Sequence, residues 1–205
     1  MSSPLKADRG LLVAFEGLDQ SGKETQAARL RVELEAAGRR VEALTFPDDA
    51  TPIGKEIRAE LASGHRWQPD VMQLLYVANR HERKPMILEW LAAGAVVICD
   101  RYLASSVAYG EAFGLDPAWL VDIQRHLPQP DLTVLLDIAP ETAVARKQQG
   151  RDRYERDTAL LGRVRASYRR QAATTANWTR IDGEQPKDAV AAAVSAAVRS
   201  RLARP

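Results

Sequence analysis

The stretch FEGLDQSGKETQAARL, from Phe15 to Leu30, decides the fold. An apolar run ends at Gly17, the frame G-x-x-x-x-G-K follows, and residues with helical spacing come next. In such a frame, backbone N–H groups cradle phosphates and a lysine, here Lys23, meets their charge. We expect glycine at Gly17 and Gly22 because a side chain would obstruct the approach of the backbone to the phosphates. The stretch therefore predicts a nucleotide-binding site.

One position departs from this motif. The residue after the lysine is usually Ser or Thr, whose hydroxyl reaches magnesium, but here it is Glu24. Thr25 can supply the hydroxyl one residue later, with the metal held largely through water and phosphates, because Mg²⁺ dehydrates reluctantly. This form favours a nucleoside monophosphate kinase over a switch GTPase. The predicted ATP-binding residues are Gly17, Leu18, Asp19, Gln20, Ser21, Gly22, Lys23, Glu24 and Thr25.

Apolar runs along the rest of the chain predict further strands. Because the runs are nearly continuous and alternate little, they are typical of strands covered on both faces of a parallel sheet. The predicted strands are Leu11–Gly17, Val41–Phe46, Ala95–Asp100, Leu132–Ile138 and Trp178–Gly183. Helical periodicity marks 25–38, 53–64, 71–94 and 186–203, together with a short helix after DRY. We therefore predict a three-layer α/β fold, a five-stranded parallel sheet flanked by helices.

Length and composition narrow the class. The chain has 205 residues, 45% hydrophobic and 27% charged, which is typical of one globular domain spanning residues 1–205. A net charge of +2 without a long basic tract argues against nucleic-acid binding. We expect no membrane span and no signal peptide. The single cysteine, Cys99, lies in an apolar run, which favours a buried strand residue and a reducing, cytoplasmic location.

The segment DRYLASSVAYG, Asp100 to Gly110, follows the third predicted strand. Asp100 at the strand end, beside the phosphate loop, can orient water on magnesium; the alternative is that it caps the next helix. Arg101 offers a planar guanidinium that matches a phosphate group. Phosphoryl transfer needs in-line positioning and cations on the transferring group, so these residues fit such a reaction.

Several motifs, in order and spacing, resemble those of the thymidylate kinase family along nearly the full chain. They are FEGLDQSGKETQ, FPDDATPIG, LLYVANR, DRYLASSVAYG, DRYERD and IDG. The resemblance implies a phosphate-loop kinase fold with a short lid, and transfer of the γ-phosphate of Mg·ATP to dTMP, giving dTDP and ADP. It also implies a homodimer, with small-molecule nucleotides as the other partners, and places Ile181–Gly183 near the adenine.

The same resemblance implies roles for individual residues. Arg101 would hold the acceptor monophosphate, Tyr76 would stack on thymine and Arg80 would donate to a base carbonyl. Tyr76 and Arg80, at i and i+4, share a helix face; viewed alone, that helix would be a core stripe with an exposed arginine. The implied substrate-binding residues are Asp19, Phe46, Pro47, Tyr76, Arg80, Arg101, Ser105, Ser106 and Tyr109. The implied metal-binding residues are Asp19, Thr25 and Asp100.

The polar segment 147–157 predicts the lid. Some family members carry a basic residue in the phosphate loop where this chain has Gln20; others supply lid arginines instead. GRDRYERD offers Arg151 and Arg153 as catalytic residues beside Lys23 and Arg101, with Arg156 nearby. The alternative for such a segment is a solvated charge run.

FPDDATPIG departs from the family pattern. Relatives usually carry an arginine next to Phe46 and Pro47 that grips the monophosphate, whereas Asp48 and Asp49 stand here. Either Arg80 and Arg101 suffice, or the acceptor differs, or the aspartates cap a helix starting near residue 51; we favour capping. Two other functions stay open: a kinase for another nucleoside monophosphate or a deoxynucleoside, and a non-catalytic nucleotide-binding protein.

Overall fold

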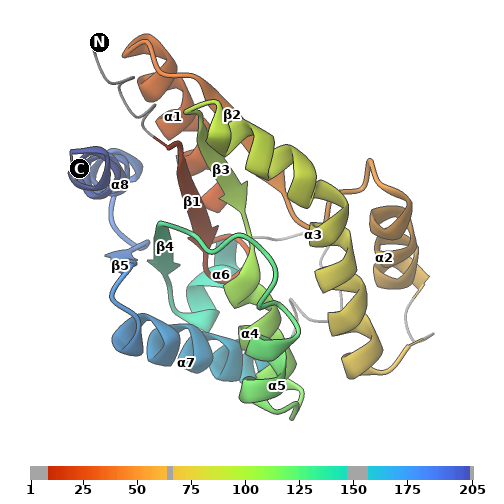
Figure 1. Ribbon diagram of the computed structural model, residues 1–205. Coiled ribbons are helices and arrows are strands. Elements are labelled where there is room, and N and C mark those ends of the chain that lie inside the picture. Colours follow the sequence, from red (N-terminus) through yellow and green to blue (C-terminus); the bar gives the residue numbers. More distant parts are fainter. Residues whose placement is uncertain (1–8, 64–66, 147–156, 204–205) are drawn as a thin grey trace.

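A parallel five-stranded sheet forms the centre of the molecule (Figure 1). The computed structural model describes residues 9–63, 67–146 and 157–203. The strand order is β2-β3-β1-β4-β5, and every neighbouring pair is parallel. The strands are β1 (Leu11–Glu16), β2 (Val41–Thr45), β3 (Val96–Asp100), β4 (Leu132–Asp137) and β5 (Trp178–Asp182). Each agrees with its predicted run to within 1 residue at either end, so the predicted sheet is confirmed.

Eight helices connect and flank the strands in the described part of the chain. They are α1 (Lys23–Ala36), α2 (Pro52–Ser63), α3 (Pro69–Ala92), α4 (Leu103–Ala112), α5 (Pro117–Asp122), α6 (Pro140–Arg146), α7 (Thr158–Thr174) and α8 (Lys187–Leu202). The sequence predicts α1 to α4 and α8, but not α5, α6 or α7. Asp157, assigned from sequence to the lid, is the N-cap of α7: its side chain accepts a hydrogen bond from the Leu160 N–H at 2.9 Å.

The side chains of β1 alternate between two hydrophobic layers. Val13 and Phe15 pack on one face of the sheet with residues of α1 and α8. Leu12 and Ala14 point to the other face, where α3 packs beside Tyr102 and Phe46. Helices α4 and α7 cover the rest of that second face, over β4. Helices therefore cover both faces, which confirms the predicted three-layer fold and explains the apolar character of the strands.

The carboxyl ends of the strands meet along one edge of the sheet, where the following loops gather (Figure 1). β1 leads into the phosphate loop and β3 into Arg101, and the two strands are adjacent. Cys99 is a buried residue of β3, as expected, and burial raises the pKa of its thiol. Within the described part of the chain, none of the helices has the length and apolar character that a membrane span requires.

Candidate active site

The loop between β1 and α1 has a left-handed backbone at three positions. They are Gly17 (φ 141°), Gln20 (φ 62°) and Gly22 (φ 96°), the last being the N-cap of α1. A Cβ on Gly17 would lie 2.5 Å from the Leu136 carbonyl oxygen, so packing against β4 requires this glycine. A Cβ on Gly22 would have nothing within 4 Å, which leaves the approach to the helix N-terminus open. Both positions thus favour glycine through their backbone conformation, and Gly17 also through its packing against β4.

Lys23 reaches back into the loop. Its Nζ donates to the carbonyl oxygens of Leu18 at 2.9 Å and Gly17 at 3.2 Å, and its side chain is buried. Burial, together with the charge of Arg101, lowers the pKa of Lys23 to about 8. The loop thus holds a lysine whose charge is costly until an anion offsets it.

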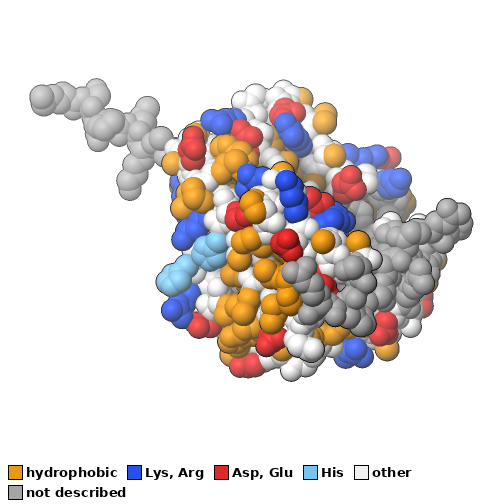
Figure 2. Space-filling view, turned by 90° about the vertical axis from the view of Figure 1, so that its right-hand side faces the viewer, with side chains coloured by type: hydrophobic (Ala, Val, Ile, Leu, Met, Phe, Trp, Pro, Cys, Tyr) orange, Lys and Arg blue, Asp and Glu red, His pale blue; other side chains and the backbone are white. Residues whose placement is uncertain are grey.

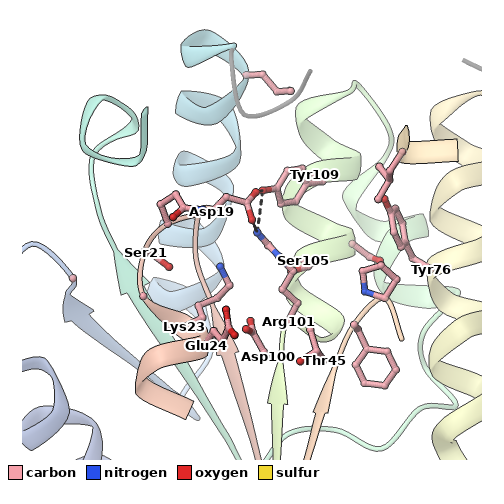
Figure 3. Close-up of a pocket in the computed structure, with 18 of the residues that line it drawn as sticks. Asp19, Ser21, Lys23, Glu24, Thr45, Tyr76, Asp100, Arg101, Ser105 and Tyr109 are labelled. Carbon is pink, nitrogen blue, oxygen red and sulfur yellow. Dashed lines mark hydrogen bonds and ion pairs between the residues drawn. The ribbon is translucent and has the colours of Figure 1, made fainter. Parts of the chain in front are cut away.

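Arg101 links the phosphate loop to α4 (Figure 3). Its Nη2 donates to Asp19 Oδ1 at 2.6 Å, while the Tyr109 hydroxyl donates to Asp19 Oδ2 at 3.1 Å. Burial alone would raise the pKa of Asp19, but the charges of Arg101 and Lys23 hold it well below its ordinary value. Asp19 therefore carries a negative charge that faces the guanidinium of Arg101.

A buried carboxylate supports Arg101 from behind. Glu16 accepts hydrogen bonds from Ser105 Oγ at 2.6 Å and from the Tyr168 hydroxyl at 3.1 Å. Both hydroxyls also accept from Arg101 Nη1, at 3.2 Å and 3.3 Å. Ser105, predicted to line a substrate pocket, does line the cavity, but its hydroxyl is already engaged with Glu16. Arg101 itself adopts φ 62°, a strained backbone for a side chain of this size.

These residues surround one cavity of about 1130 Å³. In Figure 3, Ser21, Lys23 and Glu24 lie on one side of it, Tyr76 on the other, and Arg101 between them. The predicted site residues that line it are Asp19, Gln20, Ser21, Gly22, Lys23, Glu24, Thr25, Phe46, Pro47, Tyr76, Arg80, Asp100, Arg101, Ser105, Ser106 and Tyr109. Gly17 and Leu18 are not among the lining residues; the Leu18 side chain packs in the core instead. Arg151, Arg153 and Arg156 lie outside the described residues.

Asp100, at the end of β3, places a carboxylate near Lys23. Asp100 lines the cavity, and its negative charge acts on Lys23. The alternative that Asp100 caps the next helix is wrong, because the N-cap of α4 is Tyr102, without a side-chain hydrogen bond. Glu24 and Thr25 are exposed on the first turn of α1 and line the same cavity. Oxygen ligands of this kind fit a hydrated Mg²⁺ ion.

The far side of the cavity contains a buried arginine. Arg80 is 2% exposed, and its Nη1 donates to Ser106 Oγ at 2.8 Å and to Gln124 Oε1 at 3.4 Å. Its Nε has no hydrogen-bond partner among the described residues. The alternative from sequence, a core stripe with an exposed arginine, is therefore wrong: Arg80 and Tyr76 both line the cavity. A cavity with a buried donor and an aromatic ring suits a flat polar ligand.

The aspartates after Pro47 do not cap α2, which corrects the capping prediction. Thr51 fills that role, because its Oγ1 accepts from the Gly54 N–H at 3.0 Å. Asp48 accepts from Arg83 Nε at 2.5 Å, and Asp49 accepts from Arg58. Neither aspartate lines the cavity. Their charges are therefore neutralised by arginines rather than directed at a ligand.

Two of the arginines that line the cavity were missed from the sequence. Arg58 on α2 lines the cavity, and so does Arg146 at the end of α6. Arg146 donates to the carbonyl oxygens of Gln20 at 3.2 Å and Gly183 at 2.9 Å, and so ties the phosphate loop to the end of β5. Its place just before the polar segment 147–157 was an available signal. Gly183, from the IDG motif, also lines the cavity.

Comparison with known proteins identifies relatives along nearly the whole chain. The family model described as thymidylate kinase matches residues 15–194. The Homo sapiens thymidylate kinase is 36% identical over 189 residues, covering 91% of this chain and 88% of that protein. The Ruegeria pomeroyi thymidylate kinase is 39% identical over 206 residues, covering 95% and 97%. The solved structure of Candida albicans thymidylate kinase is 29% identical, with a TM-score of 0.84, covering 95% of this chain and 93% of that one.

Proposed function

The chain belongs to the thymidylate kinase family, and we propose that it transfers the γ-phosphate of ATP to dTMP, giving dTDP and ADP. One observation carries this proposal beyond family membership. Arg101 lies in the same cavity as the phosphate loop and is held to Asp19 of that loop at 2.6 Å. A cation shared between two phosphate-binding regions suits phosphoryl transfer, which depends on positioning and on neutralising charge.

The donor half is the loop with the N-terminus of α1. Lys23 and the loop N–H groups hold the ATP phosphates, and a bound polyphosphate keeps the buried Lys23 protonated. Arg146 and Gly183 lie beside Gln20 of the loop and border the adenine. From the lid, Arg151 and Arg153 add charge when it closes over the phosphates.

The acceptor half lies between α3 and α4. Tyr76 stacks on thymine, while Arg80, whose Nε has no partner among the described residues, donates to a base carbonyl. Phe46, Pro47, Ser106 and Tyr109 shape the nucleoside pocket, and Ser105 positions Arg101. Arg101 holds the monophosphate.

Asp100, Asp19 and Thr25 are the residues that would hold Mg²⁺. Asp100 fits this role because it lines the cavity, acts on Lys23 and caps no helix. When bound, the ion neutralises phosphate oxygens and helps to align them. Asp19 has a second task, since it also orients Arg101.

The proposed assembly is a homodimer through the outer face of α3. Figure 2, which looks onto the side formed by α2 and α3, shows hydrophobic side chains gathered there. On α3, the large exposed hydrophobic residues are Val71, Leu74 and Leu88. The proposed location is the cytoplasm, supported by a single buried cysteine with no possible disulfide partner in the chain.

A coupled ADP-release assay with Mg·ATP tests the function. The acceptor panel contains dTMP, dUMP, the monophosphates of cytidine, guanosine and adenosine, and the free deoxynucleosides. We expect turnover on dTMP above all others, and a decrease of at least roughly 100-fold in Arg101→Ala, because a preorganised cation on the transferring group is lost.

Other outcomes would favour the alternatives. Turnover restricted to another acceptor would keep the donor half and replace the proposed dTMP pocket. ATP binding without turnover on any acceptor would indicate a non-catalytic protein. A non-catalytic protein is an alternative because Glu24, Asp48 and Asp49 depart from the expected motifs. Asp48 and Asp49 are paired with arginines and do not line the cavity, so only Glu24 still supports that alternative.

A further inference from the structure

Arg58 on α2 lines the cavity, and its guanidinium is bonded to Asp49, two residues after Pro47. Arg58 lines the cavity together with Thr45, Phe46 and Arg101. Its side chain is 63% exposed, whereas that of Arg101 is 15% exposed. Arg58 is therefore a solvent-accessible arginine on the acceptor side of the cavity. The loop after Pro47, on the same side, contains aspartates and no arginine.

Arg58 is bonded to Asp49, and this contact leaves some of its N–H donors without a partner in the described part of the chain. Its Nε and Nη2 both donate to Asp49 Oδ2, at 2.7 Å and 2.5 Å, and no hydrogen bond of its Nη1 occurs among the described residues. A guanidinium has five N–H donors, so this contact leaves several for a second anion. Because exposed ion pairs contribute little to stability, the side chain can shift toward a dianion at little cost.

The charge of an acceptor phosphate favours such a residue. A phosphate monoester carries nearly two negative charges at neutral pH. Arg101 is already offset by Asp19, and the buried Arg80 is engaged with Ser106 and Gln124. Arg58 also lines this side of the cavity, but its described anionic partner, Asp49, does not line the cavity.

We propose that Arg58 binds the acceptor monophosphate, so that an arginine on α2 takes the role for which the loop after Pro47 has only aspartates. The inference rests on the proposed function. In this arrangement Asp49 holds the guanidinium near the Phe46–Pro47 corner when no phosphate is bound. Arg58 contributes to binding of the monophosphate and makes no contribution to binding of the nucleoside.

The test compares the binding of dTMP and thymidine, measured by calorimetry on the full chain. In Arg58→Gln, we expect the dissociation constant of dTMP to rise roughly 10- to 100-fold, as for loss of a charge-assisted hydrogen bond. The thymidine constant and the KM for ATP should stay unchanged, which also shows that the variant is folded. Arg58→Lys, which keeps the charge but loses the fork, should lie between the two.

Lys55→Gln is the matched control. Lys55 is exposed on the same helix, outside the cavity, and its replacement changes the net charge equally. It should leave dTMP affinity unchanged. Equal weakening in both variants would reduce the effect to long-range charge and overturn the inference. If wild type binds dTMP and Arg58→Gln binds it as tightly, only the role of Arg58 fails; if wild type binds no dTMP, the proposed function fails as well.

Discussion

At the scale of single residues, burial decides how the site uses its charges. Asp19, Lys23 and Arg101 form a compact group in which the negative charge of Asp19 favours both cations, while the two cations disfavour each other. Lys23 carries the largest unmet cost, since burial and Arg101 both act against its proton. This imbalance makes phosphate binding and lysine protonation mutually favourable.

The pKa of Lys23 predicts proton uptake on ATP binding at high pH. The pKa is about 8 in the folded protein and 10.5 ordinarily, so near pH 9 the Lys23 side chain of the unliganded protein is mostly neutral. Bound phosphates raise that pKa, and binding should then take up about one proton. Calorimetry at pH 9 in buffers of different ionisation enthalpy measures the uptake. Lys23→Arg, which stays charged, should show none; a wild type without uptake would contradict the prediction.

The same shift has a sign for stability. Below about pH 8 the lysine is protonated in both folded and unfolded chains, so the cost of its burial is present in full. Between pH 8 and 10.5 the folded chain loses the proton first, so the contribution of Lys23 to stability rises with pH across that interval. Chemical denaturation of wild type and Lys23→Met over this interval should show the rise in wild type only.

Sequence alone could find the residues that lie within motifs. Lys23, Asp19 and Arg101 were found because their neighbours in the sequence define a loop or a strand end. Arg58 and Arg146 were not, because each is the single arginine of a helix, α2 or α6, and lies outside the motifs that the sequence shows. Glu16 and Tyr168 were missed as well: their contact spans 152 positions in the chain, and no local pattern encodes it.

At the scale of elements, Glu16 joins β1 to α4 and α7. Besides two hydroxyls, it accepts from the N–H groups of Tyr102 at 2.8 Å and Ser105 at 3.2 Å, and it is fully buried. Glu16→Ala would leave these donors without an acceptor, so we expect a loss of roughly 3 kcal/mol or more in the free energy of unfolding. Glu16→Gln keeps an acceptor oxygen and should cost less. Urea denaturation decides; a loss under about 1 kcal/mol in Glu16→Ala would contradict this role.

Gly54 in α2 and Gly162 in α7 allow a controlled test of packing at the start of α2. A Cβ on Gly54 would lie 1.7 Å from the Asp48 carbonyl oxygen, whereas one on Gly162 in α7 would meet nothing within 4 Å. Gly54→Ala should therefore displace the loop after Pro47, lower stability by about 1–3 kcal/mol and raise the KM for dTMP. Gly162→Ala should raise stability by about 0.5–1 kcal/mol. The opposite order in thermal denaturation would refute the packing argument.

The sequence predicted elements well where apolar residues are continuous, as in β1 and β4. It failed for α7, because the buried positions Leu160, Leu161, Val164 and Tyr168 are interleaved with arginines that hide the periodicity. Helices α5 and α6 have 6 and 7 residues, too few for a 3.6-residue period to be recognised.

At the scale of the whole molecule, the outer face of α3 is the feature that the monomer leaves unexplained. Leu74 and Leu88 are about half exposed and lie 14 positions apart, close to four helical turns, so they share one face. The inner face of the same helix packs Ile87 and Leu91 against the sheet. The helix is thus apolar on two sides, which is typical of an element between a core and a second protein surface.

The exposed apolar face of α3 predicts that the wild-type protein is a dimer. It also predicts that charged substitutions on this face dissociate the dimer. The chain has a mass of 22.6 kDa, so sedimentation should give twice that value. The double variant Leu74→Glu, Leu88→Glu would bury like charges at a two-fold interface and should sediment as a monomer. Val32→Glu, at a residue of α1 that is 66% exposed, is the control and should remain a dimer. A wild-type monomer at micromolar concentration, or a double variant that stays dimeric, would remove α3 as the interface; the active-site cavity, built within one chain, would be unaffected by either result.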